Sequence, residues 1–362
     1  MGEQPMSRIQ EVERKHERLR DLLKKHNAES LWIQRARNLS WITAGAEVAI
    51  DISSELAPYS VLITPEKRSI IVSNIELPRL RKEERFEDLG FDYAVSNWYA
   101  HELPPMPTMI SDRDDAIADE IQRMTWVLSD DEQIRYRALG SDTAAALEEA
   151  IRAAQPGESE WQIAARLDAA CRKRGGLATV NLVATDDRIA QFRHPYITDK
   201  PLDKLVMMVV CMRRGGLVAS ATRLAHFGTL PDSLRDKQDK VAAIDAAGMS
   251  ATRPGRTLGD VFAALQAAYT SQGEDEQWKL HHQGGLTGYA SRERVATPGD
   301  PTVIEVGQAF AWNPSIVGCK SEDTILLGAD GFEILTKASD DWPSIEIGIA
   351  GQTIRRPAIL EL

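Results

Sequence analysis

The hydrophobic and polar positions of the chain change their period several times, and each change predicts a different element. Apolar residues recur every three or four positions over Ser7–His26, which is typical of an amphipathic helix. Leu31–Gln34 predicts a short strand. Two more apolar runs, Ser60–Thr64 and Ser69–Ser73, predict strands joined by a Pro-Glu-Lys-Arg turn. The first hundred residues therefore predict a small α/β domain.

A longer pattern begins at Ser129. Ser129 and Glu132 have the spacing of a capping box, in which a hydroxyl and a carboxylate bind the first free amides of a helix. Two helices and a strand pair follow, and then two more helices and a strand-rich end. The expected helices are Ser129–Ala154, Ser159–Arg174, Asp232–Ala251 and Thr257–Ser271. The expected strands are Leu205–Met212, Gly216–Gly228, Thr302–Val306, Gln308–Asn313, Asp323–Leu327 and Phe332–Leu335. This repeat predicts an internal duplication of an ααβ unit.

A boundary between two domains is expected after the proline-rich stretch Glu102–Met109. The segment Asp112–Met124 that follows it predicts a short connecting helix. A chain of 362 residues has a length typical of two domains. We therefore expect an α+β protein with a small α/β domain at residues 1–125 and a larger domain at residues 126–362.

Composition and charge exclude several classes of function. The net charge of -11 argues against a nucleic-acid binder, because phosphate contacts need a basic face, and weakly against an anionic membrane surface. The polar N-terminus lacks the apolar core of a signal peptide, and no stretch has the length of a membrane span. We expect a soluble cytoplasmic protein.

The three cysteines form no Cys-x-x-Cys pair, which fits a reducing cytoplasm and excludes a thiolate zinc site. A solitary cysteine could act as a nucleophile together with a histidine. For Cys171 and Cys211 we favour a buried thiol, because their neighbours are apolar.

Several segments after residue 190 resemble the creatinase, prolidase and aminopeptidase P family. They are the segment that begins at His194, Ala219–Gly228, His281–Glu293, Gly307–Ile316 and Asp323–Thr336, the last following a Glu-Asp step. The resemblance implies a pita-bread catalytic domain, with duplicated ααβ halves around a curved antiparallel sheet, behind a smaller creatinase-like domain. It also implies a homodimer.

The same resemblance allows the family's metal ligands to be located. Metal-dependent members hold two divalent ions with two Asp, one His and two Glu, because hard oxygen ligands suit such ions. The corresponding positions are Val209 or Cys211, Ser220, His282, Asn313 and Glu322. One imidazole and one carboxylate cannot offset the charge of two divalent ions. We therefore expect no dinuclear metal site, no metal ligands and no cofactor.

Creatinase shows that the fold can act without metal, and this chain departs from the metal pattern in a similar way. The resemblance implies that His194 is the acid/base residue and that Arg292 contacts a substrate carboxylate. Creatinase keeps glutamates where this chain has Asn313 and Thr222. These two replacements argue against a guanidinium substrate, because carboxylates bind such cations.

Four residues allow more than one interpretation. Residues 276–280, just before His281 and His282, predict a strand. A His-His pair on a strand points to opposite faces, so we expect His282 rather than His281 to line the site. Arg223 lies on an apolar strand and needs an anionic partner, for which we expect Glu322, either as a structural pair or at a substrate contact. Tyr289 could donate a hydrogen bond to a ligand or belong to the core.

Our first hypothesis is a metal-independent enzyme that acts on a C–N bond of a small carboxylate-bearing molecule. Its catalytic residues would be His194, His282 and Glu322. Its substrate-binding residues would be Arg292, Asn313, Arg223, Tyr289 and His281. Two alternatives are a peptidase-like binding module without catalysis and a metallopeptidase with one weakly held ion.

Overall fold

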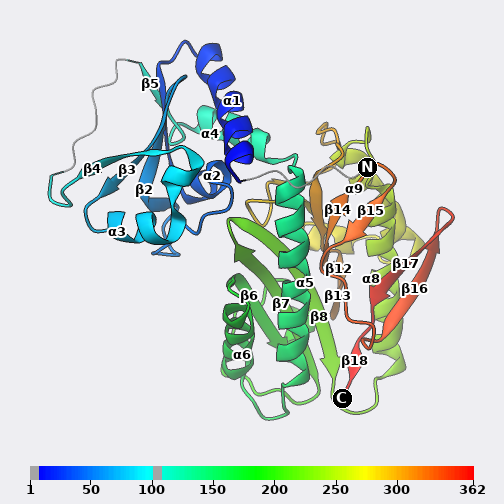
Figure 1. Cartoon of the computed structure of the whole chain (residues 1–362). Helices are drawn as coiled ribbons and strands as arrows, with labels where there is room; N and C mark the ends of the chain where they lie inside the picture. Colours follow the sequence, from blue (N-terminus) through cyan, green and yellow to red (C-terminus); the bar gives the residue numbers. More distant parts are fainter. Residues whose placement is uncertain (1–7, 101–107) are drawn as a thin grey trace. The chain divides into compact units, whose positions relative to one another are not determined.

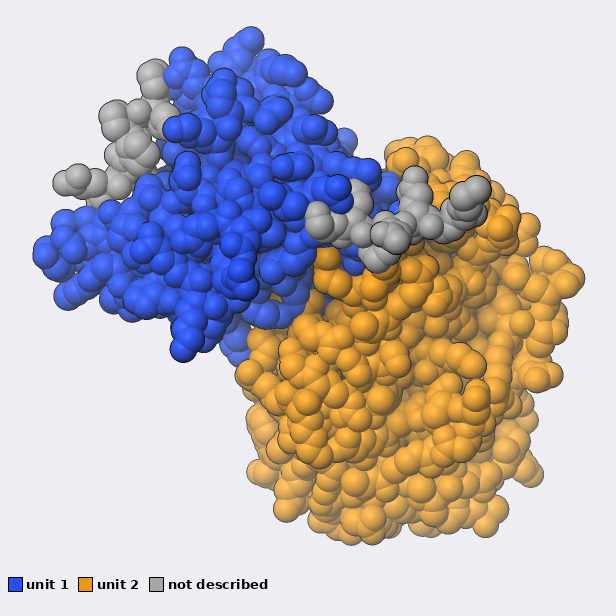
Figure 2. Space-filling view, viewed as in Figure 1, with its two compact units in different colours: residues 1–132, 215–217 blue, residues 133–214, 218–362 orange. Residues whose placement is uncertain are grey.

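The computed structural model describes residues 8–100 and 108–362, which divide into two compact units. The first unit comprises residues 1–132 and 215–217, and the second comprises residues 133–214 and 218–362 (Figure 2). Most of the proline-rich stretch 102–109 lies outside the described residues. In the described part of the chain, no helix is long and apolar enough to cross a membrane.

The first unit is built on a mixed five-stranded sheet in the order β4-β3-β2-β1-β5 (Figure 1). The strands are β1 (Ser30–Arg35), β2 (Leu56–Ile63), β3 (Arg68–Ser73), β4 (Asp92–Ser96) and β5 (Met109–Ser111). β1, β2 and β3 pair antiparallel, whereas β4 joins β3 and β5 joins β1 in parallel. The predicted strands of this domain are thus confirmed.

Helices accompany this sheet. They are α1 (Arg8–Lys25), α2 (Ala36–Ile42), α3 (Leu77–Arg79), the π-helical turn η1 (Leu80–Glu84), the 3-10 turn η2 (Phe86–Leu89) and α4 (Asp115–Thr125). The apolar stripe of α1 is buried, as its period predicts, through Val12, Leu19, Leu22 and Leu23. The helix predicted from the polar segment after residue 112 is α4, which Asp114 caps.

The second unit begins with two helices and an antiparallel strand set. These elements are α5 (Asp130–Arg152), α6 (Glu160–Lys173), β6 (Leu177–Thr185), the short α7 (Asp187–Gln191), β7 (Leu205–Arg214) and β8 (Leu217–His226). Reciprocal bonds between Ser129 and Glu132 confirm the predicted capping box of α5. Ser159 caps α6 in the same way. In Figure 1, α6 lies alongside β6.

The helix-helix-strand order then returns, which confirms the predicted duplication. The elements are α8 (Asp232–Ala251), α9 (Leu258–Ser271), the 3-10 helix η3 (Gln277–Leu280), β9 (Gly284–Thr287), β10 (Arg294–Val295), β11 (Ala309–Trp312), β12 (Ser315–Ile316), β13 (Cys319–Lys320), β14 (Asp323–Leu327) and β15 (Phe332–Ile334). One sheet has the order β10-β9-β11-β14-β15, and the other has the order β18-β8-β7-β6. β8 also bonds to the start of β14 through Ser220 and Thr222, which brings the two sheets together.

Two expected strands differ from the structure, and a hairpin at the chain end was not expected. Residues 276–280 look like a strand in the sequence but include η3, where Trp278 packs edge-on against Phe262 of α9. The run Thr302–Val306 forms no strand, and Val303 makes one isolated bridge to Thr257. The chain end contains an unforeseen hairpin and a final strand, namely β16 (Ser344–Ile349), β17 (Gln352–Pro357) and β18 (Leu360–Glu361).

Candidate active site

β11 pairs with β14 and β12 pairs with β13 in one continuous antiparallel register. This register decides on which of two faces each side chain of residues 320–323 lies. The pairs that fix this register are Trp312–Asp323, Ser315–Lys320 and Ile316–Cys319. The same register puts Asn313 beside Glu322. Because side chains alternate between the faces of a strand, Lys320 and Glu322 share one face and Ser321 and Asp323 share the other.

The face that bears Asp323 holds a buried ion network. Arg223 donates to Asp323 Oδ1 at 3.1 Å and to the carbonyl of Thr336 at 2.7 Å. Arg356 lies 2.6 Å from Asp245 and 2.7 Å from Asp323. The expectation that Arg223 pairs with Glu322 is therefore wrong. Its neighbour Thr222 contacts Glu322 instead, because adjacent residues of β8 point to opposite faces.

The opposite face holds Glu322, which is 2% exposed and has three polar partners. Thr222 donates to its Oε2 at 2.7 Å, and Lys320 Nζ lies 2.7 Å from the same oxygen. Arg292 donates to Oε1 at 2.9 Å. Burial alone would raise the pKa of Glu322, but the charges of Lys320 and Arg292 outweigh it and lower this pKa below its ordinary value. Glu322 is thus a fixed anion between two cations.

The three positions that lack the family's carboxylates lie on or beside this face. Ser220 donates to Cys211 Sγ at 3.2 Å, which places Cys211, not Val209, opposite Ser220. Burial raises the pKa of the Cys211 thiol, so a thiolate nucleophile is disfavoured there. Asn313 is buried, and among the described residues its amide oxygen has no hydrogen-bond partner. A buried acceptor without a partner marks a place where a ligand group can bind.

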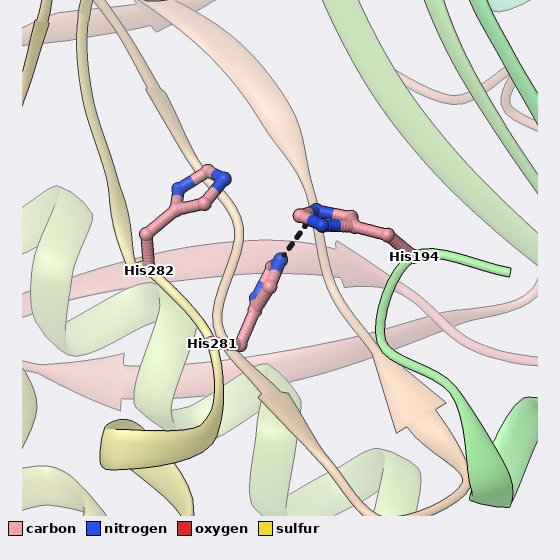
Figure 3. A group of neighbouring side chains, drawn as sticks. All are labelled: His194, His281 and His282. Carbon is pink, nitrogen blue, oxygen red and sulfur yellow. Dashed lines mark hydrogen bonds between the residues drawn. The ribbon is translucent and has the colours of Figure 1, made fainter.

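Three imidazoles gather beside this face (Figure 3). His194 Nε2 and His281 Nε2 are 3.0 Å apart, and the ring centroids of His281 and His282 are 4.6 Å apart. Ser315 Oγ lies 3.3 Å from the other nitrogen of His281, so a hydroxyl and two imidazoles form a hydrogen-bonded chain. The expectation that the His-His pair points to opposite faces is wrong, because this segment follows η3 and β9 begins only at Gly284.

The surroundings of all three histidines lower the pKa of each imidazole and so favour its neutral form. Burial, with a contribution from the charge of Lys320, lowers the pKa of His281 to about 2 and also lowers the pKa of His194. Burial and the charge of Arg292 lower the pKa of His282 to about 4. A neutral imidazole can accept a proton from a reacting group and return it. His194 is partly desolvated but still accessible, whereas its partner His281 is buried, so a ligand can reach His194 from solvent.

The residues present do not fit the family's pair of divalent ions. The resemblance puts two carboxylate positions at Val209 or Cys211 and at Ser220 and a third at Asn313, none of which is a carboxylate, and both oxygens of Glu322 are already bound by side chains. Among the described residues, the three imidazoles form a group with the spacing to hold one ion, because their ligand atoms all lie within 4.8 Å of one another. The Gly284 amide donates to His282 Nδ1, however, which leaves the proton of the neutral ring on Nε2. This tautomer offers a metal no free lone pair.

Of the residues predicted for the site, the structure brings His194, His281 and His282 together in one group and joins Arg292 to Glu322 in another. Asn313 lies beside Glu322 through the strand register, and Tyr289 is buried in the connection between β9 and β10. Arg223 belongs to the opposite face. Sequence reasoning missed Lys320, although its position two residues before Glu322 is the signal for a shared face once both lie on an extended chain.

Comparisons of the sequence with known proteins identify a family. Residues 135–329 match the model of metallopeptidase family M24. The agropine synthesis cyclase of Rhizobium rhizogenes is 28% identical over 206 residues, which cover 50% of this chain and 52% of that protein. An uncharacterised hydrolase/peptidase of Sinorhizobium fredii is 25% identical over 245 residues, covering 64% and 62%. The chain thus spans between half and two thirds of the length of these curated relatives.

Solved structures share the fold over most of the chain. The prolidase from Pyrococcus horikoshii has a TM-score of 0.71 at 18% identity and covers 91% of this chain and 99% of its own. The Xaa-Pro dipeptidase from Bacillus anthracis has a TM-score of 0.73 at 18% identity, and the match covers 97% of this chain and 100% of that protein. The predicted α+β pita-bread architecture is confirmed.

Proposed function

The chain belongs to metallopeptidase family M24, and we propose that it is an enzyme that works without the family's two-metal centre. It would act on an amide-like C–N bond of a small molecule that carries a carboxylate. The observation that carries this proposal is the contact between His194 and His281 at 3.0 Å, beside positions where Cys211, Ser220 and Asn313 replace metal-binding carboxylates.

The proposed chemistry needs one proton carrier. Neutral His194 takes a proton from the attacking water as the water oxygen bonds to the carbonyl carbon. The same proton then passes to the leaving nitrogen when the C–N bond breaks, which yields a carboxylic acid and an amine. His281 holds the His194 ring by their hydrogen bond and is itself oriented by Ser315. His282 lies close enough to both rings to share in positioning the water.

The other polar groups would bind and orient the substrate. Arg292 presents a planar guanidinium, and among the described residues its buried Nε has no hydrogen-bond partner, so it can take a carboxylate oxygen. Asn313 can accept a hydrogen bond from a substrate N–H or O–H. Glu322 has a lowered pKa and bound oxygens, so we assign it to holding Arg292 and Lys320 rather than to taking protons.

The test combines metal analysis with turnover. The full chain is purified, treated with a chelator and incubated with N-acyl amino acids and Xaa-Pro dipeptides, and the released amine is measured. We expect activity without metal, and a loss of about 100-fold or more in His194→Asn, since general acid–base catalysis typically supplies that factor. His26→Asn, a change at a residue that bonds Glu120 in the first unit, should leave activity unchanged.

Two results would overturn this proposal in different ways. Stoichiometric metal that is required for turnover would establish the metallopeptidase alternative. A lack of turnover together with tight binding of a panel compound would establish the binding module.

A second candidate is ring closure within one molecule, because a curated relative is named as the agropine synthesis cyclase. The same histidine pair would remove a proton from a hydroxyl or amine of the substrate, which then attacks the carbon of the substrate's own carboxyl group in place of water. The C–OH bond of that carboxyl group breaks, and its oxygen takes the proton back and leaves as water. The products separate the two candidates by mass. A cyclic product lighter than its substrate by one water supports the cyclase, whereas two fragments that together contain one added water support the hydrolase.

A further inference from the structure

Lys320 is a buried cation that the proposed proton transfer does not use. Its side chain is 5% exposed, and its ammonium lies 2.7 Å from Glu322 Oε2. An ammonium has three N–H donors. Within the part of the chain that the structure describes, Glu322 is the partner recorded for this ammonium, which leaves donors unused in a buried position. Buried donors of this kind normally have acceptor partners.

The charge of the cluster around Glu322 points to the same kind of partner. Lys320 and Arg292 carry two positive charges, and Glu322 carries one negative charge, so the cluster has one positive charge in excess. The neighbouring histidines respond to this field, because the charges of Lys320 and Arg292 both contribute to lowering the pKa of His194 and of His282. A buried excess charge favours a ligand of the opposite sign.

The unused donors and acceptors are close together in the fold. Lys320 pairs with Ser315, whose hydroxyl contacts His281, so the ammonium stands near the histidine chain. Lys320 also shares a face with Glu322 and, through the strand register, with Asn313. Within the described residues, Arg292 Nε and Asn313 Oδ1 are further buried atoms of this region without a partner.

We propose that Lys320 binds an anionic oxygen of the substrate and thereby supplies the positive charge that metal ions supply in metal-dependent members of the fold. This assignment rests on the proposed function and adds a catalytic residue to it. When water attacks the carbonyl carbon, the electron pair of the C=O bond moves to oxygen, and the Lys320 ammonium donates a hydrogen bond to that oxyanion. The Nε of Arg292, which has no partner among the described residues, remains available for the substrate carboxylate, and Glu322 keeps both cations in place.

The oxygen bound by Lys320 has two possible chemical sources, and two probes distinguish them. Acetate imitates a planar carboxylate, whereas inorganic phosphate imitates a tetrahedral oxyanion. Each is titrated into the intact chain at low ionic strength by calorimetry. Preference for phosphate supports the oxyanion role, and preference for acetate assigns Lys320 to the substrate carboxylate.

The variants are chosen so that charge and folding can be separated. Lys320→Met should weaken binding of the preferred probe by about tenfold to hundredfold, the range for losing a charged hydrogen bond. Lys320→Arg should retain most of the affinity. Glu322→Gln removes the internal anion that competes for the ammonium, so it should tighten binding. Lys337→Met, which removes a surface ammonium whose side chain is 62% exposed, is the matched control and should change nothing.

A double variant keeps the proposal testable if Lys320→Met folds poorly. Lys320→Met with Glu322→Gln removes both members of the Lys320–Glu322 pair, so Glu322 is not left as a carboxylate without the Lys320 ammonium, and Arg292 keeps the single positive charge of the cluster. It should bind the probe about tenfold or more weakly than Glu322→Gln alone. Equal affinities in this comparison would overturn the role of Lys320. These measurements need no turnover, so their failure is distinct from a failure of the His194 test.

Discussion

Removing the Arg356 guanidinium should destabilise the second unit severely. Arg356 lies 2.6 Å from Asp245 and 2.7 Å from Asp323, and all three side chains are at most 1% exposed. Arg356→Met keeps an unbranched side chain but leaves two buried carboxylates with one guanidinium, that of Arg223. Breaking a buried ion pair from one side costs about 3–5 kcal/mol, because a buried charge is left uncompensated. That is a large part of the roughly 5–15 kcal/mol of a typical domain.

A second substitution should return part of this loss. In the Arg356→Met background, Asp245→Asn removes the carboxylate that has lost its partner, while Asp323 keeps Arg223 at 3.1 Å. The new amide oxygen can still accept the hydrogen bond of Ser321. Burial already raises the pKa of Asp245 to about 6 against the opposing charge of Arg356, so its charged form is costly in the folded chain. We expect the double variant to be more stable than Arg356→Met by roughly 1–3 kcal/mol.

Hydrogen exchange of the intact chain, followed by mass spectrometry on peptides that span β14, measures the free energy of opening this sheet without assuming that both units unfold together. Arg355→Met is the adjacent control, because Arg355 is half exposed and should cost less than about 1 kcal/mol. The reasoning would be refuted if the losses of the two single variants simply added in the double variant. Arg356→Met and Asp245→Asn would then act independently.

Three further predictions concern the backbone, a helix cap and pH. Gly284 has a φ of +98°, and an added Cβ would clash with a carbonyl of β11, so Gly284→Ala should lower soluble yield and melting temperature far more than Gly273→Ala, whose Cβ meets open space. Ser159→Ala removes the cap of α6 and should cost about 1 kcal/mol in urea unfolding, and an unchanged midpoint would contradict the capping role. His281 and His282 have folded-state pKa values of about 2 and about 4, below the ordinary value, so stability should fall as pH drops below about 6.5, by about 2 kcal/mol for each ring at pH 5. Urea titrations from pH 8 to pH 5 should show that the free energy of unfolding changes less with pH in His281→Gln than in the unmodified chain. An equal pH dependence in both would count against this assignment.

The fold could be predicted largely because its signals are local. The capping box at Ser129 and the apolar run at Leu205–Met212 each specify an element without knowledge of the rest of the chain. The errors arose where tertiary contacts decide. Residues 276–280 were expected to be extended, but Trp278 packs against α9 and the segment coils into η3. The terminal hairpin escaped prediction because its residues alternate between exposed and half-buried without a strong apolar run.

The site was predicted less completely, because strand periodicity was applied where it fails and overlooked where it holds. His281 and His282 precede β9, so the rule that neighbours point to opposite faces does not separate them. Lys320 and Glu322 do lie on extended chain, so the same rule places their side chains on one face. Asp323 then lies on the other face, where it binds Arg223. The sequence contains these residues but does not show that the register of β12 with β13 continues into that of β11 with β14.

The division of β14 between two faces explains how the metal ligands can be absent from an intact fold. The network of Asp323 with Arg223 and Arg356 lies on the face away from the site, so it does not depend on metal. On the site face, a buried Glu322 without a cation would be costly, and a metal ion normally removes that cost in such a site. Lys320 and Arg292 remove it here with side chains. In the metal-free enzyme that we propose, compensation is therefore needed only around Glu322, and the same two cations would leave one positive charge available to a substrate.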